Sequence, residues 1–181
     1  MSNRFGDTER SNGPGAFAMS VKIGAPLGAS WQHASATCEF LGDVFAMRQA
    51  REGRDFTEAR HNIIYLVNEL LENAIKFRAP GGIDLACSLE DGNFELTVTN
   101  AAAPEVAEGF KALLAEVTTR DPGELLIERI EANAADENSS ASGLGLLTLM
   151  NDYGARLGWN FAEAKGEGSV TLTTHAALTL N

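Results

Sequence analysis

A carboxylate, an amide and an ammonium group recur at helical spacing between Asn68 and Phe77. Glu69, Asn73 and Lys76 are four and three residues apart, so a helix advancing by roughly 100° per residue would bring all three to one side. An amide oxygen can complete the shell of Mg²⁺ while the ion keeps its waters and binds phosphate oxygens. A carboxylate one turn away could orient or deprotonate an attacking hydroxyl or water. The three residues therefore indicate metal-assisted phosphate chemistry.

The helix that must position these groups is predicted over residues 57–78. Its apolar residues form one face, and Glu69, Asn73 and Lys76 lie along one margin of that face. Asn73 is thereby placed beside buried surface, which suits the wall of a pocket. An ordinary amphipathic helix would carry the same polar edge. This segment alone therefore does not show whether the three residues form a functional site or a solvent-exposed edge of the helix.

Composition narrows the class of protein. The chain has 181 residues, 44% of them apolar, which is enough for one domain with its own core. Its net charge is −11 and its 14 basic residues form no run, which argues against a nucleic-acid or anionic-membrane surface. Cys38 and Cys87 lack metal-finger spacing and are expected to be buried residues that form neither a metal site nor a disulfide. Free thiols of this kind fit a reducing cytoplasm. No apolar run approaches the roughly 20 residues that span a bilayer. We expect a soluble cytoplasmic protein.

The chain is predicted to hold a short disordered N-terminal segment and one domain. Residues 1–15 are polar and Gly-rich, with too few apolar anchors to pack, and the domain is expected over residues 16–181. Period-two and helical patterns then predict the following elements. They are a strand at 17–23, helices at 30–48 and 57–78, a strand hairpin at 83–89 and 94–99, two helices within 106–130, a helix from 143, and strands at 157–161 and 169–174.

A polar segment ending in two glycines precedes the last helix. Residues 131–142 are small and polar, the composition of a mobile loop. Gly143 and Gly145 stand where the next helix begins, so backbone could approach a ligand there, and the unpaired N–H groups of a helix start favour phosphate. A Gly-rich hinge would look the same. The sequence contains no GxxxxGK[ST] loop. The GxGxxG fingerprint is also absent, because Thr148 occupies its last glycine position.

Taken in order, these motifs resemble the Bergerat-fold ATPases, the GHKL group of gyrase, Hsp90, histidine kinases and MutL. The resemblance rests on Asn68-Glu-Leu-Leu-Glu-Asn-Ala-Ile-Lys76, the hairpin, the loose segment, Ser142-Gly-Leu-Gly-Leu146 and Gly166-Glu-Gly-Ser-Val-Thr171, and it spans about residues 17–176. It implies a two-layer α/β sandwich, with helices on one face of a mixed, mostly antiparallel sheet. It also implies ATP held between the helices and a lid near residues 131–142.

The resemblance also implies roles for single residues. Glu69 matches the general base, Asn73 the Mg²⁺ ligand and Lys76 a phosphate contact. The second glycine box matches Gly143, Leu144, Gly145 and Leu146. Ser169 corresponds loosely to a hydroxyl near the adenine, although a solvent-facing strand residue would also fit.

The first glycine box departs from the family pattern. The family ends the second hairpin strand with Asp-x-Gly-x-Gly, and the aspartate accepts a hydrogen bond from the adenine amino group. Here the matching stretch is Asn100-Ala-Ala-Ala-Pro104. Asn100 still offers a side-chain oxygen, but an amide must be correctly oriented and lacks the strength of a charged acceptor. We expect weaker nucleotide binding.

A stand-alone domain of this kind is similar to the anti-sigma-factor serine kinases and the SiaB-type kinases of bacterial partner-switching systems. The run from Gly143 to Trp159 resembles the latter group most. The resemblance implies a serine/threonine kinase that uses ATP and Mg²⁺ on a small STAS-like antagonist or a sigma-factor-type regulator. The alternative is a non-catalytic partner-binding module with weak or degenerate nucleotide binding. Trp31, Phe40 and Phe45 could serve a homodimer interface or pack in the core.

Overall fold

The computed structural model of the chain describes residues 3–24, 31–135, 143–163 and 168–181. The strands are β1 (Arg4–Gly6), β2 (Phe17–Ile23), β3 (Arg78–Glu90), β4 (Asn93–Ala102), β5 (Arg156–Glu163) and β6 (Val170–Thr179). The helices are α1 (Trp31–Arg51), α2 (Phe56–Phe77), α3 (Pro104–Val117), α4 (Pro122–Ala135) and α5 (Leu144–Asn151).

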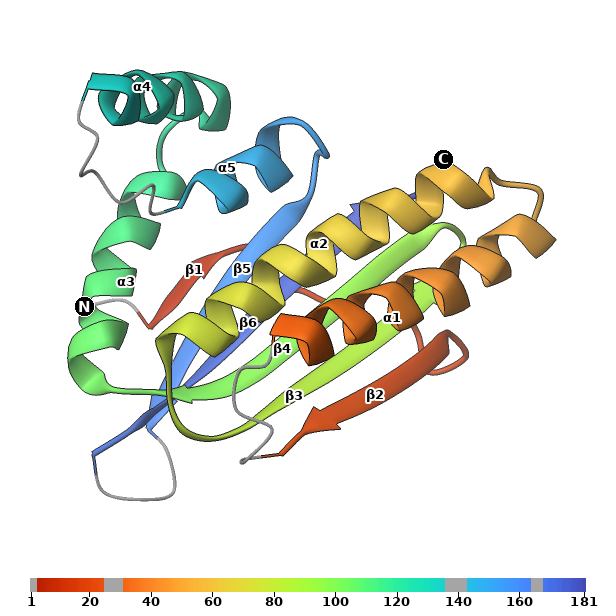
Figure 1. Cartoon of the computed structure of the whole chain (residues 1–181), viewed down its shortest axis with the longest axis horizontal. Coiled ribbons are helices and arrows are strands. Elements are labelled where there is room, and N and C mark those ends of the chain that lie inside the picture. Colours follow the sequence, from red (N-terminus) through yellow and green to blue (C-terminus); the bar gives the residue numbers. More distant parts are fainter. Residues whose placement is uncertain (1–2, 25–30, 136–142, 164–167) are drawn as a thin grey trace.

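Within these residues the strands form one six-stranded sheet in the order β1-β5-β6-β4-β3-β2, and every neighbouring pair is antiparallel. The helices lie on one face of the sheet (Figure 1). This arrangement confirms the predicted two-layer α/β sandwich. Alternate residues of β4, among them Phe94, Leu96 and Val98, turn toward the helices and are buried.

The two elements that frame the site have local causes. Helix α2 begins after Asp55, whose carboxylate accepts a hydrogen bond from the Glu58 N–H at 2.8 Å and so caps the first turn. The β3–β4 hairpin closes with a two-residue loop in which Asp91 and Gly92 have φ of 48° and 82°. Positive φ at both positions matches the right-handed twist of a tight hairpin, which explains the Asp-Gly step.

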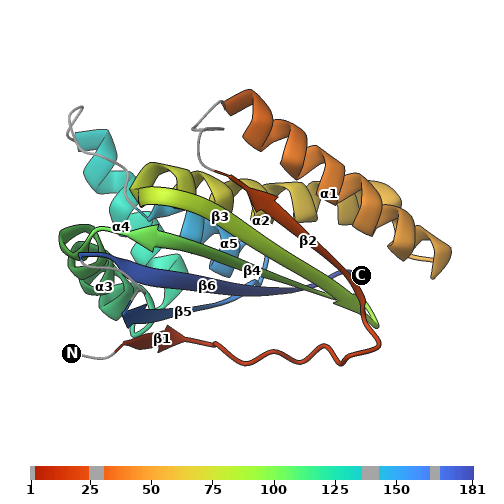
Figure 2. The same cartoon turned by 90° about the horizontal axis from the view of Figure 1, so that it is seen from below.

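The N-terminal segment departs from the prediction of disorder. Arg4–Gly6 pairs with β5, and the chain then passes beneath the sheet from β1 to β2 (Figure 2). There the Ser11 N–H and Oγ–H each donate to Glu95 Oε1 at 2.7 Å, and the Asn12 N–H donates to it at 3.2 Å. Glu95 is only 4% exposed. The prediction for residues 1–15 is therefore wrong over residues 3–15, because a polar segment is held by a distant buried carboxylate instead of apolar anchors.

Replacing Glu95 with glutamine should destabilise the fold by about 1–3 kcal/mol, because the hydrogen bonds to Oε1 lose their charge assistance. Burial raises the pKa of Glu95, but hydrogen bonds from Ser11, Asn12 and Asn93 outweigh burial and hold it below its ordinary value. Its contribution to stability is therefore full above the unfolded-state pKa and is lost as the pH falls through the lowered, folded-state pKa. Urea unfolding at several pH values measures both effects.

The matched control is Asp84→Asn on the same outer face of the sheet. Asp84 forms an exposed ion pair with Lys22 at 3.3 Å, and exposed pairs contribute little to stability. Equal stability losses in the two variants would show that the Glu95 network does not anchor the N-terminal segment.

The segment expected as a lid is partly helical. Helix α4 continues through Glu131 to Ala135, so the predicted loop is wrong over residues 131–135, where alanine and glutamate extend the helix. Residues 136–142 of the predicted lid lie outside the described residues. Helix α4 packs through Leu125 on Val117 of α3 and Leu147 of α5, and it thereby positions the start of α5.

Other predictions concern burial. Cys38 and Cys87 are buried free thiols, and burial raises the pKa of each to about 12. Phe45 is fully buried in the core, whereas Phe40 is 51% exposed. The side chain of Trp31 lies outside the described part of the chain. The same holds for residue 30, where the helix that corresponds to α1 was predicted to begin. No helix in the described ranges is both long and apolar enough to cross a membrane.

Candidate functional site

Helices α2 and α5 lie side by side and run in opposite directions (Figure 1). Tyr65, Glu69 and Asn73 follow one another at intervals of four residues along α2, so they form a stripe on one side of the helix. Tyr65 lies beside Thr148 in the middle of α5. Glu69 meets the first turn of α5, and Asn73 lies beyond that contact. The helix pair therefore brings the motif of α2 to the glycines that precede α5.

The carboxylate of Glu69 packs directly on Gly145. A Cβ added to Gly145 would lie 2.7 Å from Glu69 Cδ and closer still to Oε2, so this position has no room for a larger residue while Glu69 keeps its place. Burial, followed by repulsion from the nearby carboxylate of Glu72, raises the pKa of Glu69. A carboxyl group with a raised pKa is better suited to accept a proton.

Gly143 has a different structural role. It is the residue before α5, with φ of +88°, a left-handed conformation that glycine adopts without strain. The Leu147 N–H donates to the Gly143 carbonyl at 3.1 Å, which closes the first turn. Arg129 of α4 lies against Gly143 and donates to Glu116 of α3 at 2.8 Å. The glycine pair thus shapes both the start of α5 and its contact with Glu69.

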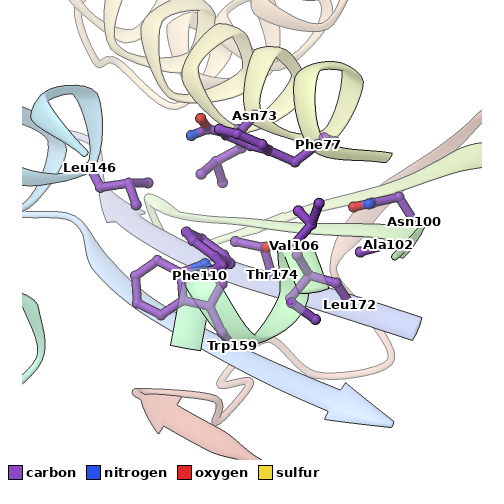
Figure 3. Close-up of a pocket in the computed structure, with 13 residues that line it drawn as sticks. Asn73, Phe77, Asn100, Ala102, Val106, Phe110, Leu146, Trp159, Leu172 and Thr174 are labelled. Atoms are coloured by element: carbon purple, nitrogen blue, oxygen red, sulfur yellow. The ribbon is translucent and has the colours of Figure 1, made fainter. Parts of the chain in front are cut away.

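A cavity opens beside Asn73, between the second half of α2, helix α3 and the sheet (Figure 3). Its walls are mainly apolar and aromatic, and its polar side chains are Asn73, Asn100 and Thr174. The lining residues are Leu70, Asn73, Ala74, Phe77, Asn100, Ala102, Val106, Ala107, Phe110, Leu146, Trp159, Leu172 and Thr174. The volume of this space is about 20 Å³, room for a single water molecule. Among the lining residues, Phe77 and Phe110 are half-buried and Val106 is exposed.

Asn100 reaches the cavity because of strand alternation. It is on β4 in step with Leu96 and Val98, so its side chain turns toward the helices and is 4% exposed. Its Nδ2 donates to the Ala101 carbonyl at 3.0 Å. Oδ1 accepts no hydrogen bond from any described residue. The amide is therefore held with its acceptor atom available to a donor in the cavity.

Of the remaining predicted residues in the described part of the chain, Leu146 alone lines the cavity. Leu144 and Gly145 are half-buried beside it. Lys76 is exposed, with Nζ 5.1 Å from the centre of the Phe77 ring. Ser169 is half-buried just before β6 and does not line the cavity. The structure thus brings Asn73, Asn100 and Leu146 together around one space, with Glu69 bordering it at Gly145.

Sequence reasoning missed the aromatic walls and one polar group. Thr174 lies on β6 opposite Val98 of β4, and Trp159 of β5 is opposite Thr174. Leu172, Thr174 and Ala176 alternate toward the helices, a period-two pattern that would have placed the Thr174 hydroxyl on the inner face. Phe110 belongs to the predicted helix after Asn100, but its contact with Trp159, with ring centres 6.2 Å apart, depends on the tertiary arrangement.

No protein-family model matches this sequence, and no curated protein matches it. A chain from the crystal structure of the SiaB–SiaC complex from Pseudomonas aeruginosa is similar in structure, with a TM-score of 0.64 and 15% sequence identity. The similarity covers 88% of this chain and 89% of that chain. Since it extends over nearly the whole length of both, the two chains share one fold.

Proposed function

We propose that this chain is an ATP-binding regulatory kinase that phosphorylates a serine or threonine of a small protein partner in a cytoplasmic partner-switching system. The observation that carries the proposal is the contact of Glu69 with Gly145 at the edge of a cavity lined by Asn73 and Asn100. The likeness to a chain from the SiaB–SiaC complex supports a protein partner, for which a STAS-like antagonist or a sigma-factor-type regulator is proposed.

In this proposal the cavity receives the nucleotide base. Asn100 Oδ1 is the free acceptor that an adenine amino group requires, and Thr174 offers a second polar contact. Aromatic walls from Trp159, Phe110 and Phe77 suit a flat ring. A volume of about 20 Å³ is far below the roughly 300 Å³ or more of ligand pockets. Binding must therefore displace side chains, and this cost lowers the affinity.

The phosphate end is assigned to α2 and the start of α5. Asn73 would be the protein ligand of Mg²⁺, which commonly binds one or two side chains together with substrate phosphates. Gly143 to Leu146, Lys76 and, loosely, Ser169 are the further nucleotide contacts. When bound there, the ion would neutralise charge on the transferred phosphoryl group. Glu69 accepts the proton of the partner's hydroxyl as that oxygen bonds to the γ-phosphorus and the bond to the ADP oxygen breaks.

Calorimetry with Mg-ATP tests this assignment. We expect binding in the micromolar range, and Asn100→Ala should weaken it about tenfold because the base amino group loses its partner. Asn73→Ala should abolish the gain in affinity that Mg²⁺ gives. Asn68→Ala is the matched control, since Asn68 lies on the same helix, bonds to Glu72 at 3.0 Å and does not line the cavity. Equal losses in all three variants would contradict the assignment.

A second candidate function is a binding module that captures a partner without using nucleotide. The small volume of the cavity and the Asn100-Ala-Ala-Ala103 stretch favour it. The same calorimetry separates the two functions. Absence of heat and of any thermal shift at millimolar Mg-ATP would select the binding module, because a ligand that binds the folded state must stabilise it.

The pH dependence of phosphoryl transfer should report the environment of Glu69. Transfer should fall as the pH drops through the raised pKa of Glu69, since a protonated carboxyl cannot accept a proton. Glu72→Gln removes the repulsion that contributes to this raised pKa, so the acid limb should move to lower pH. Initial rates between pH 4 and pH 8 measure the shift. Glu58→Gln, at the exposed start of α2, should leave the limb in place, and an unmoved limb in Glu72→Gln would contradict the coupling.

A further inference from the structure

An aromatic cluster continues the functional stripe of α2 on the far side of Glu69 from the cavity. The rings of Tyr65 and Tyr153 stack with centres 4.6 Å apart and planes 7° apart. His61 Nε2 lies 3.2 Å from the Tyr153 hydroxyl. The order along the α2–α5 pair is therefore the cavity, Glu69 at Gly145, Tyr65 at Thr148, and finally His61 at Tyr153.

The cluster is accessible and has an acidic setting. His61 is exposed, and Tyr65 and Tyr153 are half-buried. Burial raises the pKa of both tyrosines, and the carboxylates of Glu69 and Asp152 raise it further. A surface with aromatic rings and nearby carboxylates attracts cations, through ring faces as well as through charge.

The position of the cluster relative to Glu69 limits what it can receive. If the base occupies the cavity and the reacting phosphate lies near Glu69, the acceptor hydroxyl must approach Glu69 from the side that the nucleotide does not occupy. The surface next to Glu69 on that side is formed by Tyr65, Tyr153 and His61. A segment lying across these rings would bring a side chain to the Glu69 carboxylate.

We propose that His61, Tyr65 and Tyr153 form the docking surface for the phosphoacceptor segment of the partner, an extended stretch carrying serine or threonine with lysine or arginine beside it. This proposal rests on the proposed kinase function and adds the chemistry of its substrate. The hydroxyl faces Glu69, and the basic side chains lie over the aromatic rings and near Asp152.

Amide NMR shifts of the ¹⁵N-labelled full chain can locate this surface. The probe is a synthetic heptapeptide with a central serine flanked by lysines, and the control is the same peptide with glutamates in place of lysines. We expect the lysine peptide to shift the amide signals of His61, Tyr65, Thr148 and Tyr153. No binding, equal binding of the glutamate peptide, or shifts confined to the α1 side of the molecule would overturn the proposal.

Variants give an independent measurement by fluorescence anisotropy of the labelled lysine peptide. Tyr153→Leu and His61→Ala should each weaken binding by about fivefold. Phe56→Ala is the matched control, an exposed aromatic residue on α2 outside the cluster, and it should bind the peptide as the unchanged chain does. An equal loss in Phe56→Ala would overturn the proposal. Should Tyr153→Leu prove to be unfolded, the NMR experiment on the unchanged chain decides the proposal instead.

Titrating Mg-ATP into the same labelled sample keeps the two proposals separate. Nucleotide should shift Asn100 and Thr174 in the cavity, whereas the peptide should shift the cluster. Peptide binding at the cluster without any nucleotide binding would contradict the kinase, and the cluster would then be a binding surface for a basic segment that this chain does not phosphorylate. Nucleotide binding without peptide binding would overturn the docking surface and leave the nucleotide site intact.

Discussion

Replacing Glu69 with glutamine should reduce phosphoryl transfer by about 10²–10⁴-fold, the usual contribution of a positioned general base. Glutamine keeps the size of the side chain and its contact with Gly145, so only the ability to accept a proton is lost. ATP binding should be retained, because Glu69 borders the cavity without lining it. Single-turnover transfer to the partner, measured with excess enzyme, reports the loss directly.

Stability gives an internal check on this variant. Burial and Glu72 raise the pKa of Glu69, which means that the folded state disfavours its charge. At neutral pH the uncharged glutamine should therefore leave the fold at least as stable as before. Glu72→Gln at neutral pH is the matched control and should retain transfer. A Glu69→Gln variant that phosphorylates the partner at the normal rate would remove Glu69 from the proposed mechanism.

The sequence was sufficient for elements whose causes are local. Helix α2 has its cap at Asp55 and an apolar period along its length, and the β3–β4 hairpin has its Asp-Gly turn. The N-terminal segment was missed because its contacts are distant in sequence: Ser11 and Glu95 are 84 residues apart. Propensity describes a residue and its neighbours, so it gives no sign that a polar segment will find a buried carboxylate on another strand.

The same distinction applies to the candidate site. Helical spacing was enough to place Glu69 and Asn73 along one stripe, but the stripe alone could not place Lys76, which lies exposed over Phe77. Thr174 and Trp159 enter the cavity only through the pairing of β4, β6 and β5. The contact between Glu69 and Gly145 depends on the way α5 packs beside α2. The sequence was thus enough to identify the kinds of residue at the candidate site, whereas the contacts between these residues could be found only from the tertiary structure.

Introducing one methyl group at Gly145 should damage catalysis while leaving the fold intact. In Gly145→Ala the new Cβ would occupy the space of the Glu69 carboxylate, so the side chain of Glu69 must swing away from α5. Misplacing a reacting group by about 1 Å can cost roughly 10²-fold in rate, and we expect a loss of that size. Alanine also favours the helix more than glycine does by about 1 kcal/mol, so thermal unfolding should show no large loss of stability.

Gly109→Ala separates this effect from a general response to an added methyl group. Gly109 lies within α3, and a Cβ there would meet no atom within 4 Å, so transfer should stay normal while helix propensity improves equally. The double variant Gly145→Ala with Glu69→Gln should be no slower than Glu69→Gln alone, because both changes act on the same carboxylate. Additive losses in the double variant would mean that Gly145 acts on the phosphates independently of Glu69, and the positioning role would then be wrong.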